Sequence, residues 1–328
     1  MEEFDIRSVE NDIRRSLEHV LLTAGIYCRV FSRSKTMDSI CRKLESGKGK
    51  YSSDGKKMQD IIGVRVIFYF WEDIDVICDF LRHQPDFIDE SNTYKELSED
   101  PAYQNIGNLT TLTDKLFMPT RLNLVFRMSD VQTLLLRDAL SRVQSFDVGL
   151  IDNTYEVQLR SVLSEGWHEV EHDLRYKSKH EPWWQKCEAE SRMLNGIYAS
   201  LETSEHAMTA IFASMAQKNM QGGYWEAMVR NHFCLHFIPP QSGSSHIEQW
   251  LSDLFTHDHS LPTRILRIHR NEVIPYILRI RKPYPLTMMN LLYIVNRIRI
   301  RKPEIIRHEP SVIKTRLDEL FCEGVAGK

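Results

Sequence analysis

The chain has 328 residues, of which 42% are hydrophobic and 27% are charged, with a formal net charge of -3. This composition is typical of a globular protein of about two domains, and no run approaches the roughly 20 apolar residues of a membrane span. The acidic start MEEFDIRSVEND lacks the form of a secretory signal and the six cysteines form no CxxC pair, so we expect a reducing, cytoplasmic setting without membrane contact.

The first part of the chain predicts helices on either side of one strand that is rich in apolar residues. Residues 8 to 24 and 34 to 44 place apolar side chains at helical spacing, which predicts two helices. Residues 45 to 57, rich in Gly, Ser and Lys, predict a basic loop. The run DIIGVRVIFYF, residues 60 to 70, predicts a buried strand, and residues 71 to 83 predict the next helix. Residues 84 to 116 are polar and predict irregular structure.

Two later segments alternate between apolar and polar residues. They are RLNLVFRM, residues 121 to 128, and TYEVQLR, residues 154 to 160. A period of two puts the apolar side chains on one face of a strand and the charged and amide side chains on the other. A solvated sheet face would explain one such strand. Asp60 and Arg65 on a third strand favour a polar cleft built on the sheet.

Beyond Arg160 the pattern becomes helical, and a second long helical pattern covers residues 183 to 220. Gly222, Gly223 and the segment IPPQSGSSH, residues 238 to 246, are typical of a boundary. We therefore predict a first domain over residues 1 to 220 and a basic C-terminal extension over residues 221 to 328.

The C-terminal extension has an uneven charge. Between Arg264 and His308 there are eleven Lys or Arg but only two acids, Glu272 and Glu304. Such a stretch suits contact with RNA phosphates. The alternation of Ile with Arg in RILRIHR and YIVNRIRIRKP equally suits a face that docks on the acidic first domain or on a partner protein. Both interpretations stay open, as does homo-oligomerisation.

The segment HEVEH, His168 to His172, fits the HExxH pattern of zinc proteases. Two histidines four residues apart on a helix could hold Zn²⁺, with Glu169 as the base. Glu171 and Asp173 put charges where such proteases usually have none, and no third ligand stands out. The pattern is therefore weak evidence for a zinc hydrolase.

Carboxylates and cations accompany the predicted sheet. Asp60 opens one strand, and Glu156 lies on the polar face of another. Two carboxylates from neighbouring strands suit Mg²⁺, which proteins hold with one or two acids plus substrate phosphates. Phosphoryl and pyrophosphoryl transfer depend on positioning and charge neutralisation. The candidate phosphate ligands are Arg33, Lys35, Lys43, Arg65, Arg160 and Lys177.

Three motifs occur along the chain in a recognisable order: SRSKTMDSICRKL, DIIGVRV and TYEVQLRSVLSEGWHEVEHDLRYK. They resemble, in turn, the RxKxxxSIxxKL segment, the D-L-I-G-I-R strand and the ExQxRT strand with a helix ending in EHxLxYK of RelA/SpoT-type (p)ppGpp synthetases. That family includes small alarmone synthetases and toxic small alarmone synthetases. The resemblance covers about residues 10 to 215.

The resemblance implies an α/β (α+β) fold, with a nucleotidyltransferase-like mixed sheet and flanking helices. It also implies an ATP-dependent pyrophosphokinase, which moves the β,γ-pyrophosphate of ATP to the 3′-hydroxyl of GDP, GTP or an adenine nucleotide with the help of Mg²⁺. Asp60 would ligate the Mg²⁺, and Glu156 would complete the metal site or help to deprotonate the attacking hydroxyl.

By the same resemblance, Arg33, Lys35 and Lys43 would contact the ATP donor. Arg65 would hold donor phosphates or brace its strand. The remaining members, which would line the site or close it from the helix, are Gln158, Arg160, His172 and Lys177.

One segment departs from the family pattern. The family usually has a P-x-x-x-G-Y-x-S-x-H-like segment whose Tyr stacks on the acceptor guanine, whereas this chain has FMPTRLNLVFRM. The acceptor therefore stays open between a free nucleotide and the 3′ end of tRNA, and a toxin or defence effector is compatible with either. An alternative of another class is a nucleotide-sensing regulatory module with weak or no catalysis.

Overall fold

The computed structural model describes residues 2–47, 49–92, 122–142, 147–176, 181–239, 245–280 and 282–323. The chain forms two units, one of Met1–Glu18 and Cys28–Thr203, the other of His19–Tyr27 and Ser204–Lys328. The domain boundary predicted at residue 220 stays a prediction. None of the described helices is long and apolar enough to cross a membrane.

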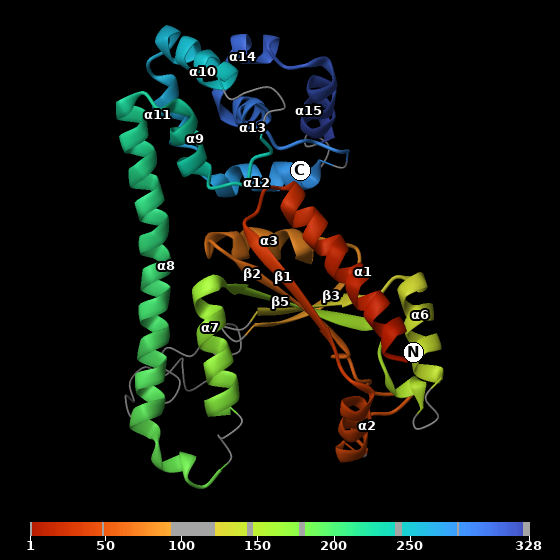
Figure 1. Ribbon diagram of the computed structural model, residues 1–328. Helices are drawn as coiled ribbons and strands as arrows, with labels where there is room; N and C mark the ends of the chain where they lie inside the picture. The colour runs from red at the N-terminus through yellow and green to blue at the C-terminus, as the bar shows by residue number, and fades with distance from the viewer. Residues whose placement is uncertain are drawn as a thin grey trace. The chain divides into compact units, whose positions relative to one another are not determined.

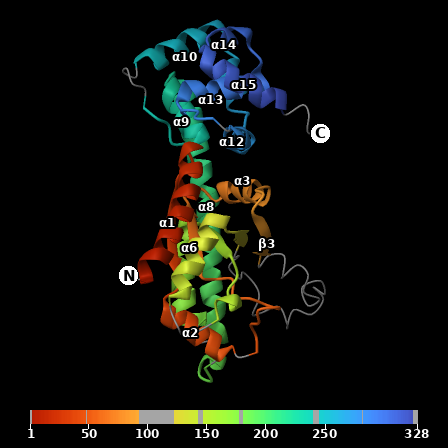
Figure 2. The ribbon, with the colours of Figure 1, turned by 90° about the vertical axis from the view of Figure 1, so that its right-hand side faces the viewer.

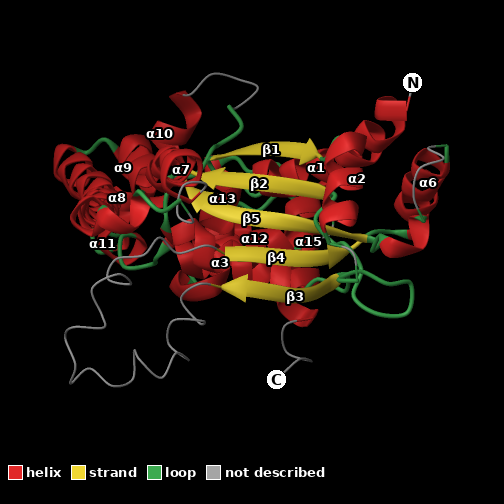
Figure 3. Cartoon of the chain, turned by 90° about the horizontal axis from the view of Figure 1, so that it is seen from below, coloured by secondary structure: helices red, strands yellow, loops and turns green. Residues whose placement is uncertain are grey.

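In the described residues of the first unit, a mixed sheet has five strands in the order β1-β2-β5-β4-β3 (Figures 1 and 3). Only β2 and β5 are parallel, and the other neighbours are antiparallel. The predicted α/β class with a mixed sheet is confirmed. The strands are β1 (Cys28–Ser34), β2 (Ile62–Phe68), β3 (Phe87–Asn92), β4 (Leu122–Arg127) and β5 (Thr154–Ser161).

The register of the strands gives the sheet one apolar and one polar face. Val64 of β2 pairs with Val157 of β5, which pairs in turn with Leu124 of β4. All three side chains are buried. Since successive side chains in a strand point to opposite faces, the residues between them point to the other face, which carries most of the predicted site.

The apolar face of the sheet is covered by helices α1 (Glu2–Thr23), α3 (Glu72–Arg82) and α6 (Asp130–Ser141). Ser32, on that face of β1, donates a hydrogen bond of 2.7 Å to Glu10 of α1. Helices α1 and α6 lie side by side (Figures 1 and 2), joined by a 2.7 Å hydrogen bond from Gln132 to Asp12. With this side covered, the polar face remains for a site.

The sequence analysis missed two edge strands. The helix predicted from Ser34 begins at Met37, as α2 (Met37–Ser46), because the chain before it is β1. Only Val30 of β1 is buried, so this edge strand lacks the apolar alternation by which the inner strands were predicted. Strand β3 lies in the stretch predicted to be irregular, and its sequence FIDESN is mostly polar. At both edges of the sheet, hydrogen bonding to the neighbouring strand decides that a strand forms, although the local amino-acid composition does not favour one.

At the carboxyl end of β5 the chain enters helix α7 (Val162–Val170), followed by a π-helical turn, Glu171–Tyr176. Ser161 caps α7, its hydroxyl accepting from the backbone N–H of Ser164 at 3.2 Å. Cap hydrogen bonds of this kind satisfy amides that have no partner within the helix. The cap therefore helps to fix where α7 leaves the sheet.

The described part of the second unit is helical. It contains the C-terminal part of α8 (Glu188–Gly222) and, in chain order, α9 (Trp225–Phe233), α10 (Ser245–His257), α11 (Leu261–Ile265), α12 (Arg270–Arg279), α13 (Met288–Val295), α14 (Pro303–Arg307) and α15 (Ser311–Glu323). Most of α13 is buried, so it forms the core of this unit.

The basic charges of the C-terminal extension are compensated in part by ion pairs within the chain. Asp258 pairs with Lys302 at 2.8 Å, and Glu309 pairs with Arg297 at 2.6 Å. Both acids lie outside the stretch from Arg264 to His308 in which the cations were counted. At least six of its eleven Lys and Arg are in ion pairs: Arg264, Lys282, Arg297, Arg299, Lys302 and Arg307. Arg299 and Arg307 pair with the two acids inside the stretch, Glu272 and Glu304. The local count therefore overstates the positive charge available to RNA.

A half-buried histidine, His232, gives the second unit a predicted pH response. Burial lowers the pKa of His232 below its ordinary value, although a 2.8 Å hydrogen bond to the carbonyl of Ile268 acts in the opposite direction. As the pH falls below about 6.5, the unfolded chain takes up a proton that the folded chain resists, so stability is lost on the acid side. We expect His232→Gln to lose less thermal stability than the wild type between pH 7.5 and 5.5.

The measurement is the melting temperature of both proteins at the two pH values. Each kcal/mol corresponds to a shift of roughly 2–4 °C for a unit of this size. Equal losses in the two proteins would show that His232 does not carry the effect.

Candidate functional site

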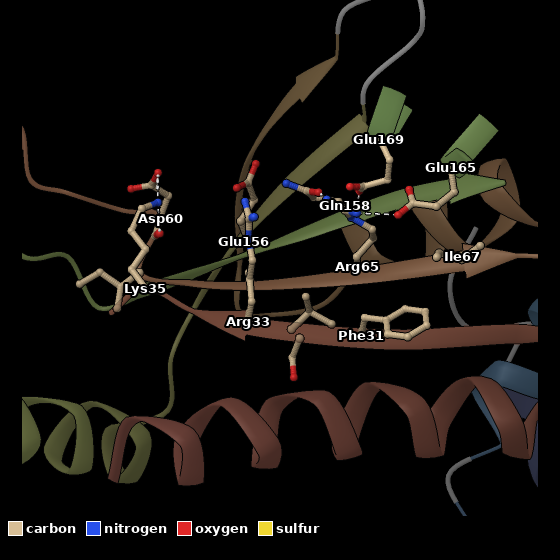
Figure 4. A pocket seen from close by; sticks show the side chains of 14 residues that line it. Phe31, Arg33, Lys35, Asp60, Arg65, Ile67, Glu156, Gln158, Glu165 and Glu169 are labelled. Carbon is tan, nitrogen blue, oxygen red and sulfur yellow. Dashed lines mark hydrogen bonds and ion pairs between the residues drawn. The ribbon is translucent and has the colours of Figure 1, made fainter. Parts of the chain in front are cut away.

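A cavity of about 480 Å³ lies on the polar face of the sheet (Figure 4). Its walls come from β1, β2, β5, α7 and the residues that flank β1 and β2. The residues that line it are Phe31, Ser32, Arg33, Lys35, Asp60, Ile61, Gly63, Val64, Arg65, Ile67, Glu156, Gln158, Glu165 and Glu169.

Strand register brings the predicted residues together. Arg33 of β1 pairs with Gly63 of β2, and Gly63 pairs with Glu156 of β5. Arg33 and Glu156 therefore flank a position that has no side chain. Two residues away along each strand, Phe31 pairs with Arg65, and Arg65 pairs with Gln158. The side chains of both rows share the face that bounds the cavity (Figure 4).

Asp60 is held by two lysines. Lys35 Nζ lies 2.6 Å from Asp60 Oδ2 and 2.8 Å from its backbone oxygen. Lys43 Nζ, from α2, lies 2.8 Å from Oδ1 and 2.6 Å from Oδ2. Burial by itself would raise the pKa of Asp60, but the hydrogen bonds from Lys35 and Lys43 outweigh burial and hold this pKa below its ordinary value. Asp60 is therefore an ionised carboxylate at neutral pH.

Glu156 has the opposite electrostatic environment. Burial raises its pKa, and the negative charge of Asp60 raises it further, while Gln158, Lys35 and Arg33 act against the shift without cancelling it. A carboxylate in this position is more basic than an ordinary glutamate, and it gains from any cation that comes between it and Asp60.

Arg65 is bound by carboxylates of the same chain. Its Nη1 lies 2.5 Å from Glu165 Oε1 and 2.5 Å from Glu169 Oε1. Its Nε donates to Gln158 Oε1 at 3.3 Å, and Arg160 pairs with the other oxygen of Glu165 at 2.9 Å. Of the two roles expected for Arg65, the contacts are those of a brace between the sheet and α7.

Three of the expected site residues that the structure describes do not line the cavity. Lys43 contacts a cavity residue, Asp60, through a hydrogen bond. Arg160 contacts another cavity residue, Glu165, in the same way. His172 lies half exposed with Nδ1 2.9 Å from Asp173. Lys177 is outside the described residues, as are residues 117 to 121 of the segment FMPTRLNLVFRM, which takes the place of the family's acceptor segment.

The two histidines of HEVEH lie in different environments. His168 is buried against the rings of Trp167 and Tyr198, whereas His172 is half exposed beside Asp173. The π-helical turn begins at Glu171, so the four-residue spacing of an α-helix, on which the zinc interpretation depended, does not apply. The described residues contain no group of three or more His, Cys, Asp or Glu that could hold a metal.

Among the cavity residues that the sequence analysis did not place in the phosphate and metal site are Phe31, Glu165 and Glu169. Glu165 and Glu169 are four residues apart, and such residues share one face of a helix. That spacing was visible in the sequence, but nothing in the sequence showed that this face meets Arg65. Phe31 belongs to a strand that was not predicted.

The donor set suits a hard divalent cation. Mg²⁺ in phosphate-transfer sites is usually held by one or two carboxylates together with substrate phosphates and water. Asp60 and Glu156 are two such carboxylates, and burial, followed by the negative charge of Asp60, raises the pKa of Glu156. These two residues therefore fit Mg²⁺ once a phosphate chain supplies the other ligands.

Comparison with known proteins gives one family match. Residues 32–181 match a family described as a region found in RelA/SpoT proteins. This range includes every residue that lines the cavity except Phe31. No curated protein matches the chain.

The solved structures to which the chain is similar have low sequence identity and TM-scores below 0.5. Small alarmone synthetase 1 from Bacillus subtilis is 18% identical, with a TM-score of 0.41 over 62% of this chain and 92% of that chain. A GTP pyrophosphokinase family protein from Streptococcus pneumoniae is 17% identical, with a TM-score of 0.42 over 63% and 91%. For small alarmone synthetase 2 from Bacillus subtilis the values are 17%, 0.37, 64% and 93%.

Proposed function

We propose that the protein is a nucleotide pyrophosphokinase of the RelA/SpoT type, which moves the β,γ-pyrophosphate of ATP to the 3′-hydroxyl of a nucleotide. The match of residues 32–181 to a region found in RelA/SpoT proteins supports this proposal. The observation that carries this proposal is the meeting of Asp60, Glu156, Arg33 and Lys35 in one cavity. Two carboxylates beside two cations are what a metal-assisted transfer of phosphate groups requires.

In this proposal the cations hold the donor. Arg33 and Lys35 lie on the cavity wall nearest the two carboxylates, where they neutralise the phosphate chain. Lys43 bonds both oxygens of Asp60, so it positions that carboxylate and adds positive charge to this end of the cavity. Transfer of a pyrophosphoryl group gains mainly from such positioning and neutralisation.

Asp60 and Glu156 would hold Mg²⁺ between them and the phosphates. Bound there, Mg²⁺ would supply charge neutralisation of the transferred phosphates. Glu156, whose pKa is raised by burial and by Asp60, is also the stronger base of the pair. It is suited to accept the proton of the attacking hydroxyl, because a base works best when its pKa approaches the working pH.

We further propose a free nucleotide as the acceptor rather than the 3′ end of tRNA. The RNA interpretation depended on the positive charge between Arg264 and His308, and at least six of the eleven cations there are engaged in ion pairs within the chain. A toxic or defensive role would follow from the product, and slowed growth on expression of the wild type but not of Glu156→Gln would support it.

The test is an incubation of the full chain and Mg²⁺ with γ-labelled ATP and, in separate reactions, GDP, GTP, ADP, ATP or deacylated tRNA. We expect label to move to one or more of the free nucleotides, as resolved by chromatography. Label on tRNA would support the RNA alternative. ATP binding without transfer to any acceptor would instead favour a nucleotide-sensing module.

A further inference from the structure

Phe31 is a large apolar side chain in an unusual place. It is 50% exposed, and it lines the cavity beside charged and amide groups. Folding leaves half of its surface in water, and an exposed aromatic ring on a cavity wall is a ready contact for a planar ligand. In Figure 4 it lies on β1 next to Arg65, away from Asp60.

The cavity has two chemically different ends (Figure 4). One end holds Arg33, Lys35, Asp60 and Glu156, with Lys43 just behind Asp60. These side chains carry three positive and two negative charges, an excess of positive charge that suits a phosphate chain. The other end holds Phe31 and the Arg65 brace.

Arg65 contributes no free positive charge to its end. Its guanidinium is shared by Glu165 and Glu169, and Arg160 pairs with Glu165. Two cations and two carboxylates therefore balance, and the carboxylates disfavour a phosphate there. The same contacts hold the guanidinium in place opposite Phe31, with which Arg65 is paired across the strands.

We propose that Phe31 is the stacking surface for the nucleobase of the donor nucleotide, whose phosphates extend along the sheet toward Arg33 and Lys35. This inference rests on the proposed function, because it assumes that a nucleotide occupies the cavity. Phe31 and Lys35 are four residues apart on extended chain, which corresponds to about 13 Å. A base, a ribose and a phosphate chain follow one another along such a path.

The size of the effect follows from base–aromatic stacking. Removing an aromatic ring from a stacked base costs about 1–3 kcal/mol by alanine substitution, which corresponds to a dissociation constant raised roughly 5-fold to 150-fold. The effect is confined to binding, since Phe31 lies at the end of the cavity away from Asp60 and Glu156. A ligand that has phosphates but no base does not contact Phe31 at all.

The experiment compares the full-length wild type with Phe31→Ala, Phe31→Trp and Tyr69→Ala. Tyr69 is the matched control, because it is an exposed aromatic residue near the end of β2 that does not line the cavity. For each protein, the dissociation constants of ATP and of inorganic tripolyphosphate are measured with Mg²⁺, together with KM and kcat for label transfer.

For Phe31→Ala we expect ATP binding to weaken by about ten-fold or more and KM to rise in parallel. Its tripolyphosphate binding and its kcat at saturating ATP should stay within about two-fold of the wild type. Phe31→Trp should restore ATP binding, and Tyr69→Ala should behave as the wild type. Unchanged ATP binding in Phe31→Ala, or an equal loss for ATP and tripolyphosphate, would overturn the stacking role while leaving the proposed function intact. Failure of the wild type to bind ATP would overturn both.

Discussion

Glu156→Gln should abolish pyrophosphate transfer while leaving the fold intact or slightly more stable. The substitution keeps the size of the side chain and removes the charge that would hold Mg²⁺ and accept the proton of the attacking hydroxyl. Loss of a single charge-stabilising group in an active site commonly costs about 100-fold to 1,000-fold in rate, and loss of the base adds to it. We expect a decrease of at least about 1,000-fold.

The stability part of this prediction follows from the sign of the pKa shift. Burial and the charge of Asp60 raise the pKa of Glu156 above its ordinary value, so its ionised form is less favourable in the folded chain than in the unfolded chain. Above that pKa the charge costs stability, and a neutral amide removes the cost. The melting temperature of Glu156→Gln at pH 7.5 should equal or exceed that of the wild type.

The control for Glu156→Gln is Glu319→Gln, at an exposed ion pair with Lys282 in the second unit. It should change neither activity nor melting temperature appreciably, because exposed ion pairs contribute little. Appreciable transfer activity in Glu156→Gln would remove Glu156 from the catalytic set. A marked fall in its melting temperature would contradict the electrostatic account.

Gly63→Val is the second substitution with a large expected effect. A Cβ atom added at Gly63 would meet no heavy atom within 4 Å, and Gly63 is not among the glycines with positive φ. The Cβ atom of a side chain therefore has room here, and a β-branched residue favours the strand, where glycine is unfavourable by roughly 0.5–1 kcal/mol. The melting temperature should stay the same or rise.

The same side chain would stand on the floor of the cavity, between Arg33 and Glu156. It would occupy the space in which a phosphate chain has to approach the sheet, and misplacement of a substrate by 1 Å can cost about 100-fold in rate. We expect ATP and tripolyphosphate binding to fall together, and transfer to drop by at least that factor.

Gly196→Ala in α8 is the matched control, because a Cβ atom there also meets nothing within 4 Å and the residue does not line the cavity. It should gain stability, as alanine does over glycine in a helix, with full activity. Normal ATP binding by Gly63→Val would show that the ligand does not use this part of the cavity.

The inner strands of the sheet were predictable because their chemistry is local. The alternation in residues 122 to 128 and 154 to 160 specified both the strands and the face on which Glu156 lies. The edge strand β1 was not predictable in this way, since a single residue of it, Val30, is buried. Its existence depends on hydrogen bonding to β2, which lies some thirty residues further along the chain.

Some of the charged residues of the site were likewise predictable from the sequence, and others were not. The sequence indicated Asp60, Glu156, Arg33 and Lys35 as one group, and all four line the cavity. It left open whether Arg65 is a phosphate ligand or a brace of its strand, because its partner Glu165 lies 100 residues further along the chain. It also overstated the charge of the basic extension, since partners such as Asp258 and Glu309 lie beyond the stretch that was counted.

By itself the sequence determined that residues 121 to 128 and 154 to 160 have an apolar and a polar face, because side-chain alternation is a property of a strand alone. The grouping of Arg33 and Lys35 with Asp60 and Glu156 came from the family resemblance. Only the tertiary structure decided which charges neutralise one another. That decision placed Arg65 against α7, left Phe31 exposed on the cavity wall and engaged at least six of the eleven cations between Arg264 and His308 in ion pairs. The physical reason is that electrostatic interactions fall off with distance in space, and distance in space between remote segments is set by the packing of the whole chain.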